Sequence, residues 1–160
     1  MIFDVTTLVG FHTVISLIAL VTGVAVVLGM LGSNTLPGMT ALFLATAILT
    51  SVTGFLFPVD HILPSHIFGV VSLLALGGAV LGRYAFGYAG KWRLAYVLGV
   101  VLATYLDAFV AVVQTFLKVP AANALAPTQG EPPFAIAQGL LLVVFIVLAV
   151  LASRRFRPLG

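Results

Sequence analysis

The chain contains no cysteine, and only 7% of its 160 residues are charged. The absence of cysteine excludes disulfides, iron–sulfur clusters, thiolate zinc sites and covalently attached c-type haem. The scarcity of charge argues against a soluble domain, in which about 25% of residues are usually charged. Because 62% of the residues are hydrophobic, lipid is the expected solvent for most side chains.

The hydrophobic residues form long runs separated by short polar or proline-containing stretches. Within lipid every backbone N–H and C=O group needs an internal partner, which leaves helices or a closed barrel. The runs last about twenty residues without strand-like alternation, whereas barrel strands need only about ten. We therefore predict an all-α integral membrane protein, a single bundle of five transmembrane helices at about 5–31, 39–57, 64–82, 94–117 and 134–152.

Basic residues are unequally divided between the two ends of the predicted bundle. Five crossings place six of them on one side, namely Arg83, Lys91, Arg93, Arg154, Arg155 and Arg157, and Lys118 alone on the other. By the positive-inside rule the N-terminus is outside and the C-terminus is inside. Basic residues at helix ends make no nucleic-acid footprint, so the lipid bilayer is the predicted partner and nucleic acid is not.

Polar side chains within the predicted spans gather in the outer half of the bundle. His12 lies about two turns into the first helix, Asp107 and Gln114 share one face of the fourth, and Gln138 lies one turn into the fifth. The predicted ligand-binding set is His12, Ser16, His66, Asp107, Gln114 and Gln138. No catalytic residue is predicted, because no nucleophile–base pair or phosphate-binding glycine loop occurs.

Asp107 is the one acidic residue predicted to lie deep in the membrane. It precedes the outer end of its helix by eleven residues, or ~16 Å. A charged carboxylate facing lipid is costly, so the side chain should face the bundle interior. Two interpretations remain open: an ion or proton site, or a protonated carboxyl that is hydrogen-bonded to a neighbouring helix, for example to Thr46 or Thr50.

The histidines allow a haem or metal interpretation. His12 and His66 come from different helices on the outer side, so they could ligate haem b or a metal ion, the metal site being completed by His61, Asp60 or Glu131. No H-x-x-x-H or H-E-x-x-H spacing supports a metal site. The alternative is that the imidazoles hydrogen-bond to loop carbonyls.

Two further stretches bear on packing and access. Gly78 and Gly82 have the small-xxx-small spacing that allows two membrane helices to approach closely. The long connection Lys118–Pro133 contains four prolines. A connection of that length is often functional, so it is either a lid over the outer cavity or a plain connection.

Four strings resemble a group of small bacterial inner-membrane proteins with no assigned function. They are TGFLFP (53–58), LPSHIFGVVSLLAL (63–76), KWRLAYV (91–97) and QTFLKVPAANALAPTQGEPPF (114–134). The resemblance covers most of the chain and implies a multi-pass protein of the bacterial inner membrane. It also implies a hydrogen-bonding role at Asp107, where Asn is the more usual residue of that group.

The preferred prediction of function is a binding protein that holds a small ligand, haem or a metal ion in an outer, periplasmic pocket. The first alternative is an accessory or scaffold subunit, which packs through small-residue faces against a membrane complex or against its own copies. The second is an ion or proton-coupled transporter with Asp107 on its path. A single deep acidic residue and the lack of a predicted interrupted helix give this alternative little support.

Overall fold

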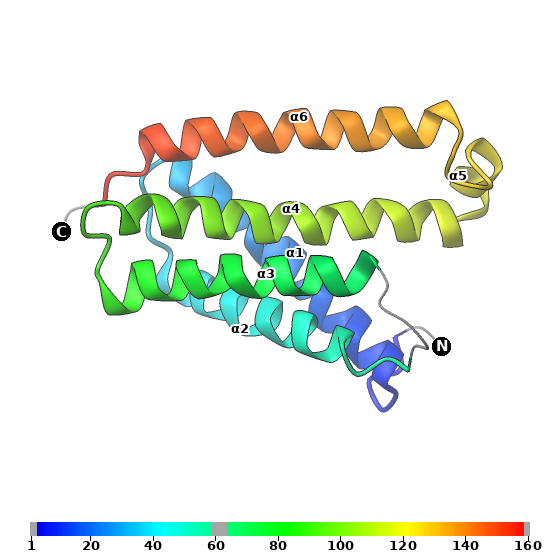
Figure 1. The fold of residues 1–160 in the computed structure, drawn as a ribbon, viewed down its shortest axis with the longest axis horizontal. Coiled ribbons are helices and arrows are strands. Elements are labelled where there is room, and N and C mark those ends of the chain that lie inside the picture. The colour runs from blue at the N-terminus through cyan, green and yellow to red at the C-terminus, as the bar shows by residue number, and fades with distance from the viewer. Residues whose placement is uncertain (1–2, 59–63, 159–160) are drawn as a thin grey trace.

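The computed structural model describes residues 3–58 and 64–158. Within these ranges the elements are α1 (Leu8–Leu31), α2 (Pro37–Gly54), α3 (Pro64–Val80), the π-helical turn η1 (Leu81–Ala85), α4 (Trp92–Lys118), α5 (Pro120–Leu125) and α6 (Pro132–Arg155), with no strand. Five of the described helices are long and apolar enough to cross a membrane. The predicted all-helical bundle with five candidate spans is therefore confirmed (Figure 1).

The helix bounds differ from the predicted ones for local reasons. α1 begins at Leu8 because the hydroxyl of Thr7 accepts a hydrogen bond from the N–H of Gly10 and caps the first turn. α2 ends at Gly54, three residues before the predicted end, where the N–H groups of Phe55 and Leu56 bond to the carbonyls of Val52 and Thr53 and tighten the last turn. The short helix α5 was not predicted, although Pro120 stands at its first position, where proline is favoured.

The five long helices run back and forth along one axis, and α4 lies at the centre of the bundle (Figure 1). α4 packs against α1, α3 and α6, whereas α6 packs on α4 and α1. We call the end with residues 3–7, 55–58 and α5 the N-terminal end, and the end with residues 32–36, 86–91 and 156–158 the arginine end. The first and last described residues thus lie at opposite ends of the bundle.

Arg83 joins three segments at the arginine end. Its guanidinium donates hydrogen bonds to the carbonyl of Thr35, at 3.0 Å, and to the hydroxyl of Tyr88. The same group lies 5.6 to 5.9 Å from the ring centres of Tyr84, Tyr88 and Tyr96, within the range of cation–π attraction. Burial raises the pKa of Tyr88 to about 12, so its hydroxyl stays protonated at neutral pH.

Arg93 joins the start of α4 to the end of the described chain. Its Nη1 atom donates hydrogen bonds to the carbonyls of Ser153, at 2.8 Å, and Phe156, at 2.9 Å. Carbonyls at a helix C-terminus have no partner within the helix, and a cation there also offsets the helix dipole. Arg93 therefore fixes the end of α6 against α4.

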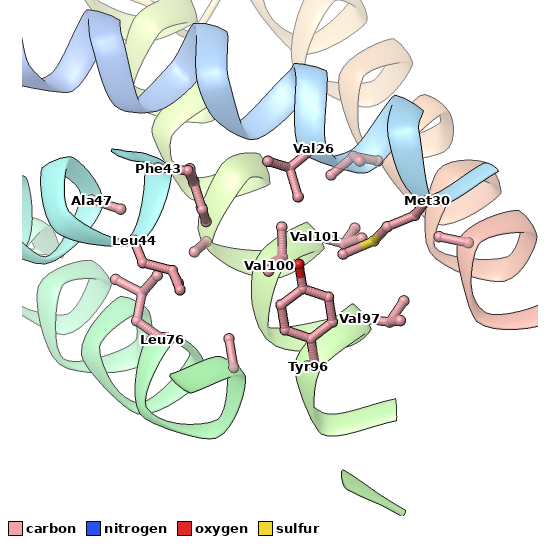
Figure 2. Close-up of a cluster of buried hydrophobic side chains, with 14 of the residues drawn as sticks. Val26, Met30, Phe43, Leu44, Ala47, Leu76, Tyr96, Val97, Val100 and Val101 are labelled. Carbon is pink, nitrogen blue, oxygen red and sulfur yellow. The ribbon is translucent and has the colours of Figure 1, made fainter. Parts of the chain in front are cut away.

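The arginine-end half of the bundle is tightly filled. Its largest fully buried side chains are Met30 of α1, Phe43 of α2, Leu76 of α3, Tyr96 of α4 and Phe156. Figure 2 shows most of them pointing toward one another between the four helices, with Val26, Val97, Val100 and Val101 around them. These residues come from the second half of α1, the first half of α2, the second half of α3 and the first half of α4.

Glycines allow α3 and α4 to approach closely. A Cβ atom at Gly99 would lie 2.3 Å from the carbonyl oxygen of Ala75, and one at Gly82 would lie 2.5 Å from that of Trp92. At Gly78 the nearest atom would be 3.9 Å away, which is ordinary contact. Of the predicted Gly78–Gly82 pair, Gly82 is therefore the residue that the close approach requires, and Gly99 is its counterpart on α4.

Substitution of Gly99 by alanine should lower stability markedly. The added methyl group would clash with the backbone of α3, and only a separation of α3 from α4 can relieve this clash. Overpacking of this kind lowers stability by about 1–3 kcal/mol. Gly77→Ala is the control, because a Cβ atom there meets nothing within 4 Å. Thermal unfolding of both variants in one detergent measures the difference. Equal midpoints would contradict the close approach.

Candidate functional site

The half of the bundle toward the N-terminal end contains a cavity of about 540 Å³ between α1, α2, α3 and α4. Its wall extends from Phe3, Lys118 and Val119 inward to Leu20, Ser72 and Leu106. The wall is mainly apolar, with the side chains of Val9, Leu17, Phe55, Phe57, Phe68 and Val110 among its members. The bundle is thus solid in one half and hollow in the other.

Small side chains explain why this half is hollow. The cavity wall includes Ser16 of α1, Ser51 of α2, Ser72 of α3 and Ala111 of α4. The core of the arginine-end half holds larger fully buried side chains, including Met30, Phe43 and Tyr96. At Gly69 the ring of Phe55 fills the space, since a Cβ atom would lie 2.8 Å from it.

The structure brings four of the six predicted ligand-binding residues to this cavity. His12 and Ser16 of α1 and Asp107 and Gln114 of α4 all line it. Gln114 is exposed and lies nearer the mouth, one turn before Lys118. The predicted convergence of polar groups from the first and fourth spans is therefore seen in the described residues.

His66 and Gln138, the other two predicted ligand-binding residues, are not among the lining residues. The ring of His66 stacks on Phe55, with centroids 5.7 Å apart and planes at 15°. Gln138 donates a hydrogen bond from Nε2 to the carbonyl of Phe109 at 3.2 Å, and so joins α6 to α4. Gln138 therefore contacts a neighbouring helix and does not line the cavity.

Asp107 is largely buried on the wall of the cavity. Its Oδ2 atom is fully buried and finds no hydrogen-bond partner among the described residues. A buried polar atom without a partner is unusual, since about nine in ten are satisfied by protein or water. A carboxylate in a nonpolar environment is especially costly without one. Because Oδ2 itself is fully buried, a molecule in the cavity meets Asp107 only at the part of its side chain that lines the wall.

The threonines of α2 do not satisfy Asp107. The hydroxyl of Thr46 donates to the carbonyl of Leu42 at 2.7 Å, and that of Thr50 donates to the carbonyl of Thr46 at 2.8 Å. A hydroxyl group has one proton, so each of these is committed to its own helix. The predicted hydrogen bond from Asp107 to Thr46 or Thr50 is absent from the described contacts.

His12 is oriented by a threonine of the neighbouring helix. Its Nδ1 atom lies 2.8 Å from the hydroxyl oxygen of Thr53, whose proton is donated to the carbonyl of Leu49 at 2.7 Å. With the hydroxyl proton on the carbonyl of Leu49 the imidazole is the donor, and we infer that Nδ1 carries the proton and that Nε2 of the neutral ring has a free lone pair. The ring of Phe57 packs edge-on against His12 at 5.2 Å.

Metal-ligating side chains do not cluster in the part of the chain that the structure describes. No group of three or more His, Asp or Glu side chains is close enough there to hold a metal ion. Of the predicted metal ligands His12, His66 and His61, the first lines the cavity, the second stacks on Phe55, and the third lies outside the described residues.

The long connection after α4 contributes little to the cavity. Lys118 and Val119 line its mouth, but no later residue of the connection does. α5 packs against α4, and the side-chain amide of Asn123 donates to the carbonyl of Phe116 at 3.0 Å. A hydrogen bond from the Thr128 hydroxyl holds the pKa of Glu131 below its usual value. The described contacts of this segment are those of a connection rather than of a lid.

Thr53 is a site residue that the sequence did not identify as one. The regular spacing of Thr46, Thr50 and Thr53 predicts a stripe on one helix face, but spacing does not show which histidine faces the stripe. Only the crossing of α1 and α2 brings residues 41 positions apart into contact.

Comparison of the chain with protein-family models, with curated proteins and with solved structures finds no match.

The tautomer of His12 gives a direct test of the site geometry. In ¹⁵N NMR spectra near pH 8, the ring of His12 should show a protonated Nδ1 and an unprotonated Nε2. Thr53→Val, which removes the acceptor, should shift the ring toward the Nε2–H form, and Thr53→Ser should retain the original spectrum. Loss of signal in His12→Gln identifies the resonance. A wild-type ring protonated on Nε2 would contradict the described hydrogen bond.

Proposed function

We propose that this chain is a multi-pass membrane protein that binds a small, mainly apolar organic ligand in the cavity between α1, α2, α3 and α4. The observation that carries the proposal is a cavity of about 540 Å³ with a mainly apolar wall and a buried, unpartnered carboxylate oxygen of Asp107. Ligand pockets usually have volumes of about 300–1,000 Å³, with apolar walls and a few polar groups that fix orientation.

The distribution of side chains supports the membrane placement. Apolar side chains such as Leu74, Leu140 and Val143 are exposed by more than half, which is unfavourable in water and favourable in lipid. The basic residues of η1, the start of α4 and the end of α6 all belong to the arginine end (Figure 1). We propose that this end faces the cytoplasm and that the cavity opens on the periplasmic side of a bacterial inner membrane.

The donor set of the cavity favours an organic ligand over haem or a metal ion. Among the described residues, one imidazole and one carboxylate line the wall, from His12 and Asp107. Haem b held by two histidines needs a second imidazole, and His66 is stacked on Phe55. The accessory-subunit and transporter functions remain predictions, because no specific contact favours either.

Whether a molecule occupies the cavity can be tested with a substitution that places a large side chain in it. The protein is purified in nanodiscs and extracted with organic solvent, and the extract is analysed by mass spectrometry. We expect a bound molecule in near-stoichiometric amount from the wild type and at least about tenfold less from Ala111→Phe, since a phenyl group there occupies the cavity.

The control is Leu117→Phe, which adds the same group at an exposed position of α4 outside the cavity wall and should leave the yield unchanged. Equal amounts from the wild type and Ala111→Phe would contradict binding in the cavity. A visible spectrum of the same sample tests for haem directly. A Soret band would show that the bound molecule is haem and would contradict the proposed organic ligand.

The proposed topology is tested by reporter fusions. A reporter that is active only in the periplasm should be active at the N-terminus and inactive at the C-terminus, and a cytoplasmic reporter should give the reverse result. Activity of one reporter at both termini would show an even number of crossings and contradict the five-span arrangement.

A further inference from the structure

We propose that the ligand of the cavity is an amphipathic amine whose ammonium group lies against Asp107 and whose hydrocarbon part fills the apolar wall. This inference rests on the proposed function and deepens it by naming the chemical class of the ligand. Three properties of the cavity lead to it: a carboxyl side chain on the cavity wall whose buried Oδ2 atom has no partner among the described residues, a wall rich in hydrogen-bond acceptors, and no lysine or arginine near Asp107 among the described lining residues.

The first property is the state of Asp107. Its Oδ2 atom is buried and has no partner among the described residues. An ionised carboxylate in an apolar cavity is stabilised by an opposite charge within hydrogen-bonding distance. A ligand ammonium supplies both the charge and the N–H donors, whereas a hydroxyl supplies one donor and no charge.

The second property is that most hydroxyl groups on the cavity wall already donate their proton to a helix carbonyl. Six hydroxyl groups line the cavity, those of Thr13, Ser16, Thr50, Ser51, Ser72 and Thr115. Four of them donate to carbonyls of their own helices: Thr13 to Val9, Ser16 to Thr13, Thr50 to Thr46 and Thr115 to Ala111. Toward the cavity these four oxygens can only accept. A ligand with several N–H donors suits such a wall.

His12 adds another acceptor to the wall. Because Thr53 accepts the hydrogen bond from the protonated Nδ1, the free lone pair of the neutral ring is on Nε2. An ammonium group has three donors, so it can bond to the carboxylate and to one or two uncharged acceptors at once. A carboxylate head group would instead face acceptors and the negative charge of Asp107.

The third property concerns the positive charges. Among the described lining residues, Lys118 is the one basic side chain. It is exposed and lies eleven residues after Asp107 on the same helix, a rise of ~16 Å, which is farther than a lysine side chain reaches. Among the described lining residues no lysine or arginine is therefore a counter-ion for Asp107, so the opposite charge would come from a cationic head group.

The test compares three probes that have the same chain and different head groups. Octylamine, 1-octanol and octanoate are titrated into the protein in phosphatidylcholine nanodiscs at pH 7 by calorimetry, with the signal of empty nanodiscs subtracted to remove partition into lipid. We expect octylamine to bind at least about tenfold more tightly than octanol, the size of a charged hydrogen bond, and octanoate to bind most weakly.

Asp107→Asn should remove the preference for octylamine over octanol. This substitution keeps the shape of the side chain and removes the charge, and equal affinity for octanol in the wild type and the variant shows that the cavity is intact. Glu131→Gln is the matched control, because it removes an acid at the same end of the bundle and outside the cavity wall, and it should retain the preference.

The outcomes separate this inference from the proposed function. If none of the probes binds beyond empty nanodiscs, both are overturned. If octylamine and octanol bind equally, or if Asp107→Asn retains the preference, the amine is overturned and the apolar ligand cavity stands. If octanoate binds most tightly, the proposal of an amine ligand is overturned. The ligand's head group would then be an anion that binds Lys118 at the mouth of the cavity.

Discussion

The cavity depends on a simple constraint: each hydroxyl group has one proton, and a helix carbonyl four residues earlier usually takes it. The hydroxyls of Thr22, Thr46, Thr50, Thr53 and Thr104 all donate to carbonyls of their own helices. The polar residues of the bundle therefore add few donors between helices. Asp107 is left without a partner, and His12 must use its own proton to bond to Thr53.

Side-chain packing divides the bundle into a filled half and a half with a cavity. In the arginine-end half, close packing at Gly82 and Gly99 and aromatic side chains such as Tyr96 hold four helices together. In the other half the cavity wall includes Ser16, Ser51, Ser72 and Ala111 among larger apolar side chains, and His12 and Asp107 lie on the same wall. The tightly packed half fixes the positions of the helices, which keeps their ends apart around the cavity in the other half. Binding sites generally need rigid support of this kind.

The sequence predicted what hydrophobicity and helix geometry determine. The five candidate spans follow from the long apolar runs, and the common face of Asp107, Gln114 and Lys118 follows from the helix repeat, which returns to nearly the same side every seven or eleven residues. All three residues line one cavity. Positions within one helix were therefore accessible to sequence analysis.

Relations between helices were not accessible in the same way. His66 and Gln138 lie at suitable depth, but depth does not fix rotation about the helix axis, and neither residue is on the cavity wall. The partner of His12, Thr53, depends on how α1 crosses α2. The position of Phe55 over Gly69 depends on a missing side chain in a third helix, which the repeat along one helix cannot reveal.

The way in which α6 is attached has a consequence for its surroundings. Only Phe145 and Ala152 of this helix are buried, yet Gln138 fixes it near one end and Arg93 holds carbonyls near the other. These two attachments lie fifteen residues apart, or about 22 Å along the axis, so the helix cannot roll on the bundle. In the proposed membrane setting, acyl chains beside α6 would therefore meet the exposed side of a helix that is attached near both ends.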